Sequence, residues 1–197
     1  AIIAFKVSRK DYSGFHIAAS HSDSPTLKIK ESSEMNVENQ YVKLNVEKYG
    51  GMLCAPWFDR PLSVAGRIIV KDGNRLTTKL INVDRDLLMI PNLAIHMNRE
   101  VNDGYKYNIQ KDMLPLYRMS NSGKAFKEMI AEEAGVSVDQ IKGMDLFLYN
   151  RMEGTIWGCD GEFISAPRLD DLQCAFTSTM ALLNSESDRC IPVVAVF

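Results

Sequence analysis

The sequence predicts an α/β fold in which two α/β pieces flank a β-rich insert. Three observations support this prediction. Short apolar runs at Ile2–Phe5, Phe15–Ser20 and Ile191–Phe197 are typical of strands buried in a helix-flanked sheet. Residues 41–83 instead alternate apolar and polar side chains, as half-buried antiparallel strands do. After Arg168 a helical apolar period returns the chain to the α/β pattern.

The first α/β piece is assigned to residues 1–31. It holds the first two apolar strands, which a polar turn over Ser8–Ser13 joins. Leu27–Lys30 alternates in polarity and is predicted to be a short strand. The polar stretch Glu31–Gln40 is expected to be a linker, so the first domain boundary is placed after residue 31.

The insert is assigned to residues 32–151. Leu62–Val70 and Thr77–Val83 are predicted strands, and Gly73 tolerates the positive φ of the tight turn between them. Several short strands with tight turns favour a small barrel or a sandwich. One amphipathic helix is expected over Ser122–Ala134, with Ser122 as its N-cap and Gly135 just past its end.

The second α/β piece is assigned to residues 152–197. A helix is predicted from Arg168 to about Leu183, and Asp170 or Asp171 can cap its N-terminus. Ile191–Phe197 is expected to be a buried parallel strand. Both ends of the sequence lie inside apolar runs, as expected for a piece of a longer chain.

Composition excludes some partners. The chain has 197 residues, 46% of them hydrophobic, which is ordinary for a globular protein. A net charge of −2 gives no electrostatic reason to expect binding to nucleic acid or to an anionic membrane. The four cysteines are scattered without a C-x-x-C pair, as is typical of reduced thiols in an intracellular protein. No apolar segment reaches membrane-spanning length, and we expect a cytoplasmic protein.

His21 and Asp23 are the first candidate functional residues. They follow the strand Phe15–Ser20, and ligands of open α/β sheets bind at the carboxyl ends of strands. Residues i and i+2 of extended backbone project to the same side, so both side chains can point at one site. A metal-bound histidine needs an acceptor for its second ring N–H, which Asp23 can supply. On its own, this local pattern favours a simpler interpretation, a strand end followed by a serine-rich turn.

The other histidines and the paired aspartates leave alternatives open. His16 is out of phase with the residues that face His21, which predicts a structural role. His96 lies in an apolar segment with helical spacing, where a structural histidine is the default. An aspartate at a helix start, such as Asp170 or Asp171, is most often a cap. Two carboxylates together with an imidazole also suit zinc or manganese.

Taken together, the motifs give the chain a family resemblance over nearly its whole length. It resembles the aspartyl aminopeptidase family of dinuclear zinc metallopeptidases. Five segments that occur in order carry the resemblance: His21-Ser22-Asp23-Ser24-Pro25, Tyr49-Gly50-Gly51, Trp57–Arg67, Ile90–Arg99 and Ser165–Leu172. The resemblance implies part of a catalytic domain with a helix-flanked mixed sheet. It also implies an inserted β-rich, barrel-like domain that mediates dimerisation within a larger, commonly dodecameric, homo-oligomer.

The resemblance implies roles for individual residues. His21 matches a zinc-ligand histidine, and Asp170 matches the aspartate that bridges two zinc ions, with manganese or cobalt as alternatives. Asp23 matches the carboxylate that orients the first ligand and supports catalysis. His96 matches an insert histidine that reaches a neighbouring subunit's active site and stabilises the substrate or the oxyanion. The Asp170–Asp171 bond matches a non-proline cis peptide bond of related dinuclear aminopeptidases.

The implied activity is hydrolysis of N-terminal residues, acidic ones in part of the family, from peptides by a metal-activated water. In the family, the general-base glutamate and further ligands follow the strand that matches Ile191–Phe197. The chain by itself is therefore expected to be inactive. Two alternatives remain, a non-catalytic module for oligomerisation and an inactive homologue.

Overall fold

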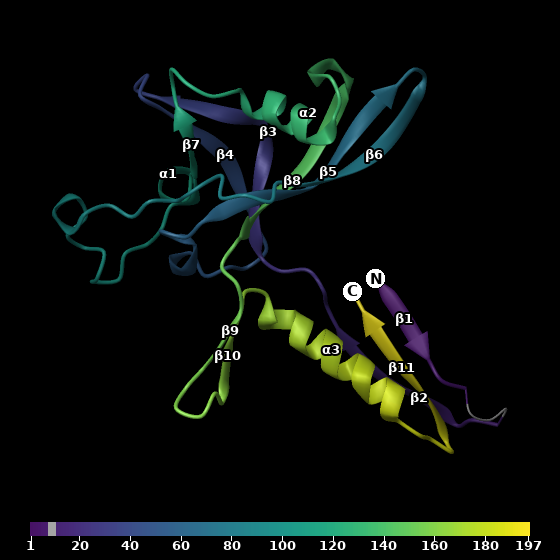
Figure 1. The fold of residues 1–197 in the computed structure, drawn as a ribbon. Coiled ribbons are helices and arrows are strands. Elements are labelled where there is room, and N and C mark those ends of the chain that lie inside the picture. The colour runs from purple at the N-terminus through teal and green to yellow at the C-terminus, as the bar shows by residue number, and fades with distance from the viewer. Residues whose placement is uncertain (8–10) are drawn as a thin grey trace. The chain divides into compact units, whose positions relative to one another are not determined.

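The structure is a computed structural model that describes residues 1–7 and 11–197, and it contains two compact units (Figure 1). The terminal unit consists of Ala1–Ser24 and Glu153–Phe197, and the central unit consists of Pro25–Met152. The predicted boundary after residue 31 therefore falls inside the central unit. Part of the predicted turn at Ser8–Ser13 lies outside the described residues.

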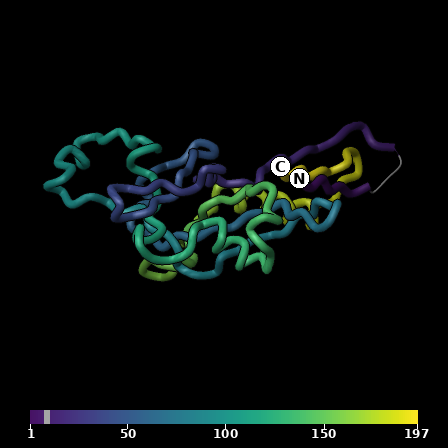
Figure 2. Tube along the Cα trace, turned by 90° about the horizontal axis from the view of Figure 1, so that it is seen from above, coloured from purple at the N-terminus to yellow at the C-terminus, as the bar shows by residue number. Residues whose placement is uncertain are grey.

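The terminal unit is built on a mixed sheet in the order β1-β11-β2. Its strands are β1 (Ile2–Phe5), β2 (Gly14–Ser20) and β11 (Cys190–Val196). β11 runs parallel to β2 and antiparallel to β1, which confirms the predicted mixed sheet. Ile2 pairs with Val196 in the β1–β11 ladder, so the two chain ends lie side by side (Figure 2).

Helix α3 (Leu169–Asn184) packs on this sheet, as the apolar period after Arg168 predicted. Leu182 of the helix contacts Val194 and Val196 of β11 in a small core. A hairpin of β9 (Thr155–Trp157) and β10 (Phe163–Ser165) precedes the helix. The hairpin's apolar side chains are exposed, and the sequence pattern of residues 155–165 does not predict a hairpin.

The central unit is a six-stranded sheet in the order β6-β5-β8-β3-β4-β7, with every neighbouring pair antiparallel. Its core consists of the inward-facing side chains of these strands, joined by Phe126, Met129 and Ile130 of α2. The bounds of its elements are β3 (Thr26–Val37), β4 (Tyr41–Tyr49), η1 (Ala55–Trp57), β5 (Leu62–Asp72), β6 (Arg75–Asn82), η2 (Ile95–Met97), α1 (Ile109–Asp112), β7 (Leu116–Met119), α2 (Phe126–Ala134), η3 (Val138–Gln140) and β8 (Ile141–Asn150).

The predicted β-rich insert is confirmed, but it is not a closed barrel. β6 and β7 are the outer strands of the sheet and do not pair with each other within the described residues. Isolated bridges join Leu88 to Leu62 of β5 and Met89 to Leu116 of β7. These bridges, and a third between Phe58 and Ile90, are isolated and form no continuous ladder, so the sheet stays open.

The predicted linker over Glu31–Gln40 is wrong, because β3 continues through Val37. Its polar residues form a strand because they pair with β4, past a bulge between Ile29 and Glu34. The Glu34 carboxylate accepts the Phe126 N–H at 3.1 Å and the Arg118 Nε–H at 3.4 Å. A partner distant in the sequence thus fixes this polar stretch as a strand.

The same contact explains why α2 begins at Phe126 and not at Ser122. Glu34 occupies the position of a capping acceptor, and Glu128 accepts the N–H of Ala125 at 3.1 Å. The predicted end of the helix is confirmed, because Gly135 follows it with a φ of 62°.

Replacing Glu34 with alanine is expected to lower the free energy of unfolding of the central unit by about 1–2 kcal/mol, since it removes the acceptor at the start of α2. Urea unfolding monitored by circular dichroism measures the change. Glu31→Ala, at an exposed position of the same strand, is the matched control and should cost less than about 0.5 kcal/mol. Equal losses for the two variants would show that Glu34 does not cap the helix.

No helix in the described ranges is both long and apolar enough to cross a membrane.

Candidate metal centre

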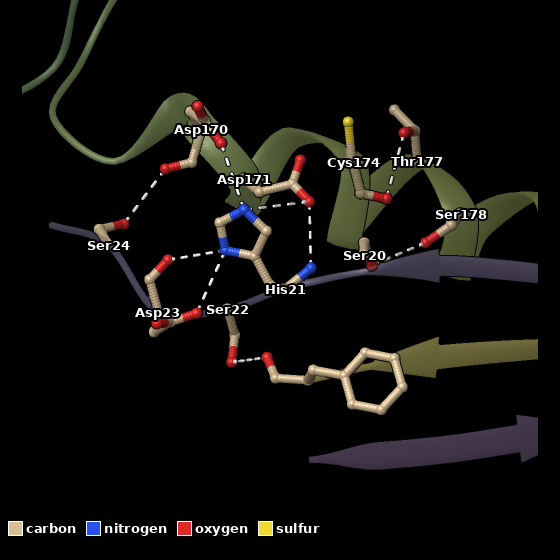
Figure 3. A network of polar contacts seen from close by, with 11 residues as sticks. Ser20, His21, Ser22, Asp23, Ser24, Asp170, Asp171, Cys174, Thr177 and Ser178 are labelled. Atoms are coloured by element: carbon tan, nitrogen blue, oxygen red, sulfur yellow. Dashed lines mark hydrogen bonds and ion pairs between the residues drawn. The ribbon is translucent and has the colours of Figure 1, made fainter. Parts of the chain in front are cut away.

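His21 lies just past the carboxyl end of β2, in a turn that is bonded to the end of β11 (Figure 3). Phe197 donates its N–H to the Ser20 carbonyl at 2.9 Å, and Ser22 donates its N–H to the Phe197 carbonyl at 2.7 Å. The Ser22 hydroxyl donates to the same carbonyl at 3.0 Å. β2 and β11 are parallel, so His21 stands at the sheet edge where α/β proteins bind ligands.

The two ring nitrogens of His21 face different groups. Nδ1 lies 3.0 Å from the Asp23 carbonyl oxygen and 3.2 Å from an oxygen of the Asp23 carboxylate. A carbonyl can only accept, so this contact places the proton of the neutral imidazole on Nδ1. Nε2 is then the nitrogen with a lone pair, and it lies 3.4 Å from Asp170 Oδ1. The structure thus brings together three residues that the sequence singled out, namely His21, Asp23 and Asp170.

The pKa of His21 is raised above its ordinary value. The hydrogen bond to the Asp23 carbonyl is the main cause, and the charges of Asp171, Asp23 and Asp170 add to it. The same negative charges would attract a bound cation, so the surroundings of Nε2 suit either a proton or a metal ion.

Asp170 and Asp171 follow each other in the sequence but lie in different environments. A cis peptide bond joins them, as the resemblance implied. The Asp170 side chain is 93% exposed and that of Asp171 is 15% exposed. The Ser24 hydroxyl donates to the Asp170 main-chain carbonyl at 3.2 Å, which leaves the Asp170 carboxylate facing His21 (Figure 3).

The Asp171 carboxylate is already used by protein donors. Its Oδ2 accepts the main-chain N–H of His21 at 3.0 Å. Hydrogen bonds from the Cys174 thiol, the His21 N–H and the Cys174 N–H lower the pKa of Asp171. The backbone of α3 is not helical at Asp170 and Asp171, and of the two aspartates it is Asp171 that accepts the Cys174 N–H of the turn that follows. Asp171 also holds the His21 backbone. The local sequence pattern gives no sign of the contacts made by Ser24 and Cys174, although the three-residue spacing from Asp171 to Cys174 fits a capping contact.

One ligand atom from each of His21, Asp170 and Asp171 lies within 4.8 Å of the others. An imidazole nitrogen with carboxylate oxygens is a donor set that zinc accepts in catalytic sites. His21 Nε2 and the exposed Asp170 carboxylate supply donors of these two kinds at the edge of the sheet.

His96 belongs to the central unit, in η2, and is exposed. Leu93, Ile95 and Met97 beside it are also exposed. Of the two default interpretations of His96 from sequence, a core histidine or a surface histidine, the structure shows the surface one. Its role in a neighbouring active site stays a prediction.

The comparisons with known proteins point to one family. Residues 1–197 match the family described as aminopeptidase I zinc metalloprotease (M18). A probable M18 family aminopeptidase 2 of Clostridium acetobutylicum is 46% identical, over 100% of this chain and 47% of the relative. A protein of the same description from Pseudomonas paraeruginosa is 36% identical, over 98% of this chain and 47% of the relative. The chain thus spans about half the length of these relatives.

Solved structures agree with the fold. The structure of mApe1 from Chaetomium thermophilum aligns with a TM-score of 0.82 at 33% identity, over 99% of this chain and 48% of the other. The S. cerevisiae mApe1 dodecamer aligns with a TM-score of 0.73 at 25% identity, over 99% of this chain and 46% of the other.

Proposed function

Because this chain belongs to the M18 family of zinc metalloproteases, we propose that the protein containing it is an aminopeptidase that removes N-terminal residues from peptides by means of a metal-activated water. The observation that carries this proposal is the 3.4 Å approach of His21 Nε2 to the Asp170 carboxylate. The two groups meet at the carboxyl end of parallel strands, where a substrate can reach them.

His21 and Asp170 are the residues of this chain that would hold the metal, with Asp170 shared between two ions. Zinc is the family's metal, and manganese or cobalt are alternatives with similar ligand preferences. The bound metal supplies a Lewis acid that polarises the scissile carbonyl and lowers the pKa of water.

Two ligands are fewer than the four that zinc takes. We therefore place the remaining ligands and the general base in the half of the relatives that this chain does not span. The 197-residue chain should then have no peptidase activity by itself.

Asp23 and Asp171 position His21 in this proposal. Asp23 accepts the Nδ1 proton and so keeps the Nε2 lone pair directed at Asp170. The Asp171 carboxylate holds the main chain of His21 by accepting the His21 N–H. Neither residue needs to touch the metal to affect its binding.

A homo-oligomer completes the proposal. One of the solved relatives is described as a dodecamer, and we propose a dimer formed through the central unit as the building block. Exposed His96 would then enter the partner subunit's active site and stabilise the oxyanion, as a preorganised donor can. All four cysteines of the chain are free thiols, which favours a cytoplasmic protein.

The direct test is hydrolysis of aminoacyl-p-nitroanilides by the protein that contains this chain, before and after removal of metal with a chelator. We expect activity that chelation abolishes and zinc restores, and a comparison of aspartyl, glutamyl and leucyl substrates shows whether acidic residues are preferred. Absence of hydrolysis with all substrates would favour an inactive homologue or an assembly module.

Asp171→Asn is expected to weaken zinc binding by about 10–100-fold, the cost typical of losing a partner that orients a ligand. Competition with a chromophoric chelator measures the affinity. Asp170→Asn should weaken binding more, because it removes a ligand. Asp188→Asn, at an exposed aspartate of the same unit, is the control and should change nothing. Equal losses for Asp170→Asn and Asp171→Asn would mean that Asp171 is itself a ligand.

A further inference from the structure

Two segments that are far apart in the sequence meet at the candidate metal centre, the loop of residues 21–24 and the start of α3 (Figure 3). Two hydrogen bonds, both donated by the loop, join them. The His21 N–H donates to the Asp171 carboxylate at 3.0 Å, and the Ser24 hydroxyl donates to the main-chain carbonyl of Asp170 at 3.2 Å. Each aspartate is thus attached to the loop through a different residue.

The two aspartates differ in which of their atoms the protein holds. The Asp171 carboxylate accepts the His21 N–H, and the thiol and the N–H of Cys174 also donate to it. The Asp170 side chain is 93% exposed, and among the described residues only the ring of His21 makes a polar contact with its carboxylate. The direction of the Asp170 carboxylate therefore depends on how the main chain of Asp170 is held.

Helix geometry does not hold that main chain. Asp170 has a φ of −86° and a ψ of 111°, which are not helical values, and the regular helix begins only after Asp171. The Ser24 hydroxyl supplies a fixed donor to the Asp170 carbonyl instead. Ser24 follows His21 by three residues, so one short loop carries the imidazole and also holds the residue that carries the carboxylate. Such support matters because a ligand binds metal tightly when its orientation is set beforehand.

We infer that Ser24 is a positioning residue of the metal centre, whose hydroxyl links Asp170 to the His21 loop and keeps the exposed carboxylate beside His21 Nε2. This inference rests on the proposed function, because it concerns the zinc that His21 and Asp170 would hold. Ser24 does not need to touch the metal. Without the hydroxyl, water can donate to the Asp170 carbonyl, but water does not connect that carbonyl to the loop. The loss therefore falls on the orientation of the ligand.

The zinc affinity of the protein that contains this chain, measured by competition with a chromophoric chelator, tests the inference. Ser24→Ala is expected to weaken zinc binding by about 10-fold, the lower end of the range for a lost orienting partner, because neither group of this hydrogen bond is charged. Ser24→Thr keeps a hydroxyl donor and should bind zinc within about 2-fold of wild type. Circular dichroism checks that each variant is folded.

Ser22→Ala is the matched control. The Ser22 hydroxyl belongs to the same loop and also donates to a main-chain carbonyl, at 3.0 Å, but its acceptor is Phe197 and not Asp170. The Ser22 N–H donates to the same Phe197 carbonyl at 2.7 Å, so the loop stays attached in the variant. Its zinc affinity should fall by less than about 3-fold.

A loss of less than about 3-fold for Ser24→Ala, or an equal loss for Ser22→Ala, would overturn the role of Ser24. Zinc binding by Ser24→Thr as weak as that of Ser24→Ala would also overturn it, because the hydroxyl would then not be the cause. A wild type that binds zinc but hydrolyses no substrate would overturn the aminopeptidase activity and leave the role of Ser24 to the affinities. A wild type that binds no zinc would overturn both.

Discussion

His21→Ala is expected to lower kcat/KM of the zinc-dependent peptidase by more than about 100-fold, because loss of a partner that only orients a ligand already costs 10–100-fold. Alanine removes the Nε2 lone pair that faces Asp170 at 3.4 Å. The Asp23 and Asp171 groups that hold His21 then have no imidazole to position. The measurement is hydrolysis by the protein that contains this chain at saturating zinc, together with its zinc affinity.

His16→Ala is the matched control for this prediction. His16 lies in β2, the strand that leads to His21. It is exposed, and it pairs in the ladder with Pro192 of β11. Its loss should leave both zinc affinity and peptidase activity unchanged. If the two alanine variants lost activity equally, the effect at His21 would come from disturbance of β2 and not from loss of a ligand.

Gly66→Ala is expected to lower the free energy of unfolding of the central unit by about 3 kcal/mol or more, the combined scale of backbone strain and overpacking. Gly66 lies in β5 with a φ of 151°. A β-carbon there would stand 2.2 Å from the Asp145 carbonyl oxygen and 2.9 Å from the Leu146 α-carbon. Both atoms are main chain of the neighbouring strand β8, so no side-chain rotation relieves the clash.

Urea unfolding of the wild type and the variant measures this loss. Gly73→Ala is the control, because Gly73 also has a positive φ of 57° but no atom lies within 4 Å of an added β-carbon. It should cost only about 1–2 kcal/mol, the price of a left-handed conformation alone. If Gly73→Ala cost as much as Gly66→Ala, the close approach of β8 would not be the cause.

Sequence pattern predicted the strands whose inward residues are apolar, and it failed where a polar stretch is held by a distant partner. Val42, Leu44 and Val46 alternate and are all buried in β4. Glu34 gives no such signal, because its contacts lie with Phe126 and Arg118, far along the chain. For the same reason the start of α2 could not be read from its own residues. A local pattern does not contain the acceptor that another strand supplies.

At the candidate site, too, contacts between residues distant in the sequence could not be predicted from local pattern. His21 and Asp23 were identified from a strand end, and their contact through Nδ1 is local. Asp170 is far away in sequence, so its contact with His21 could be expected only from the order of motifs shared with a family. The different roles proposed for Asp170 and Asp171 follow from their different exposure. Two adjacent aspartates in a sequence do not show which of them is exposed.

Zinc-edge anomalous diffraction from crystals of the protein that contains this chain tests the central claim most directly. We predict a peak bonded to His21 Nε2 and to a carboxylate oxygen of Asp170, at the distance of about 2.0–2.2 Å typical of zinc with nitrogen or oxygen ligands. Asp171 should keep its hydrogen bond to the His21 N–H in the zinc-bound protein. Absence of a peak at His21 Nε2, or a zinc ion bonded to Asp171 with Asp170 turned away, would contradict the account.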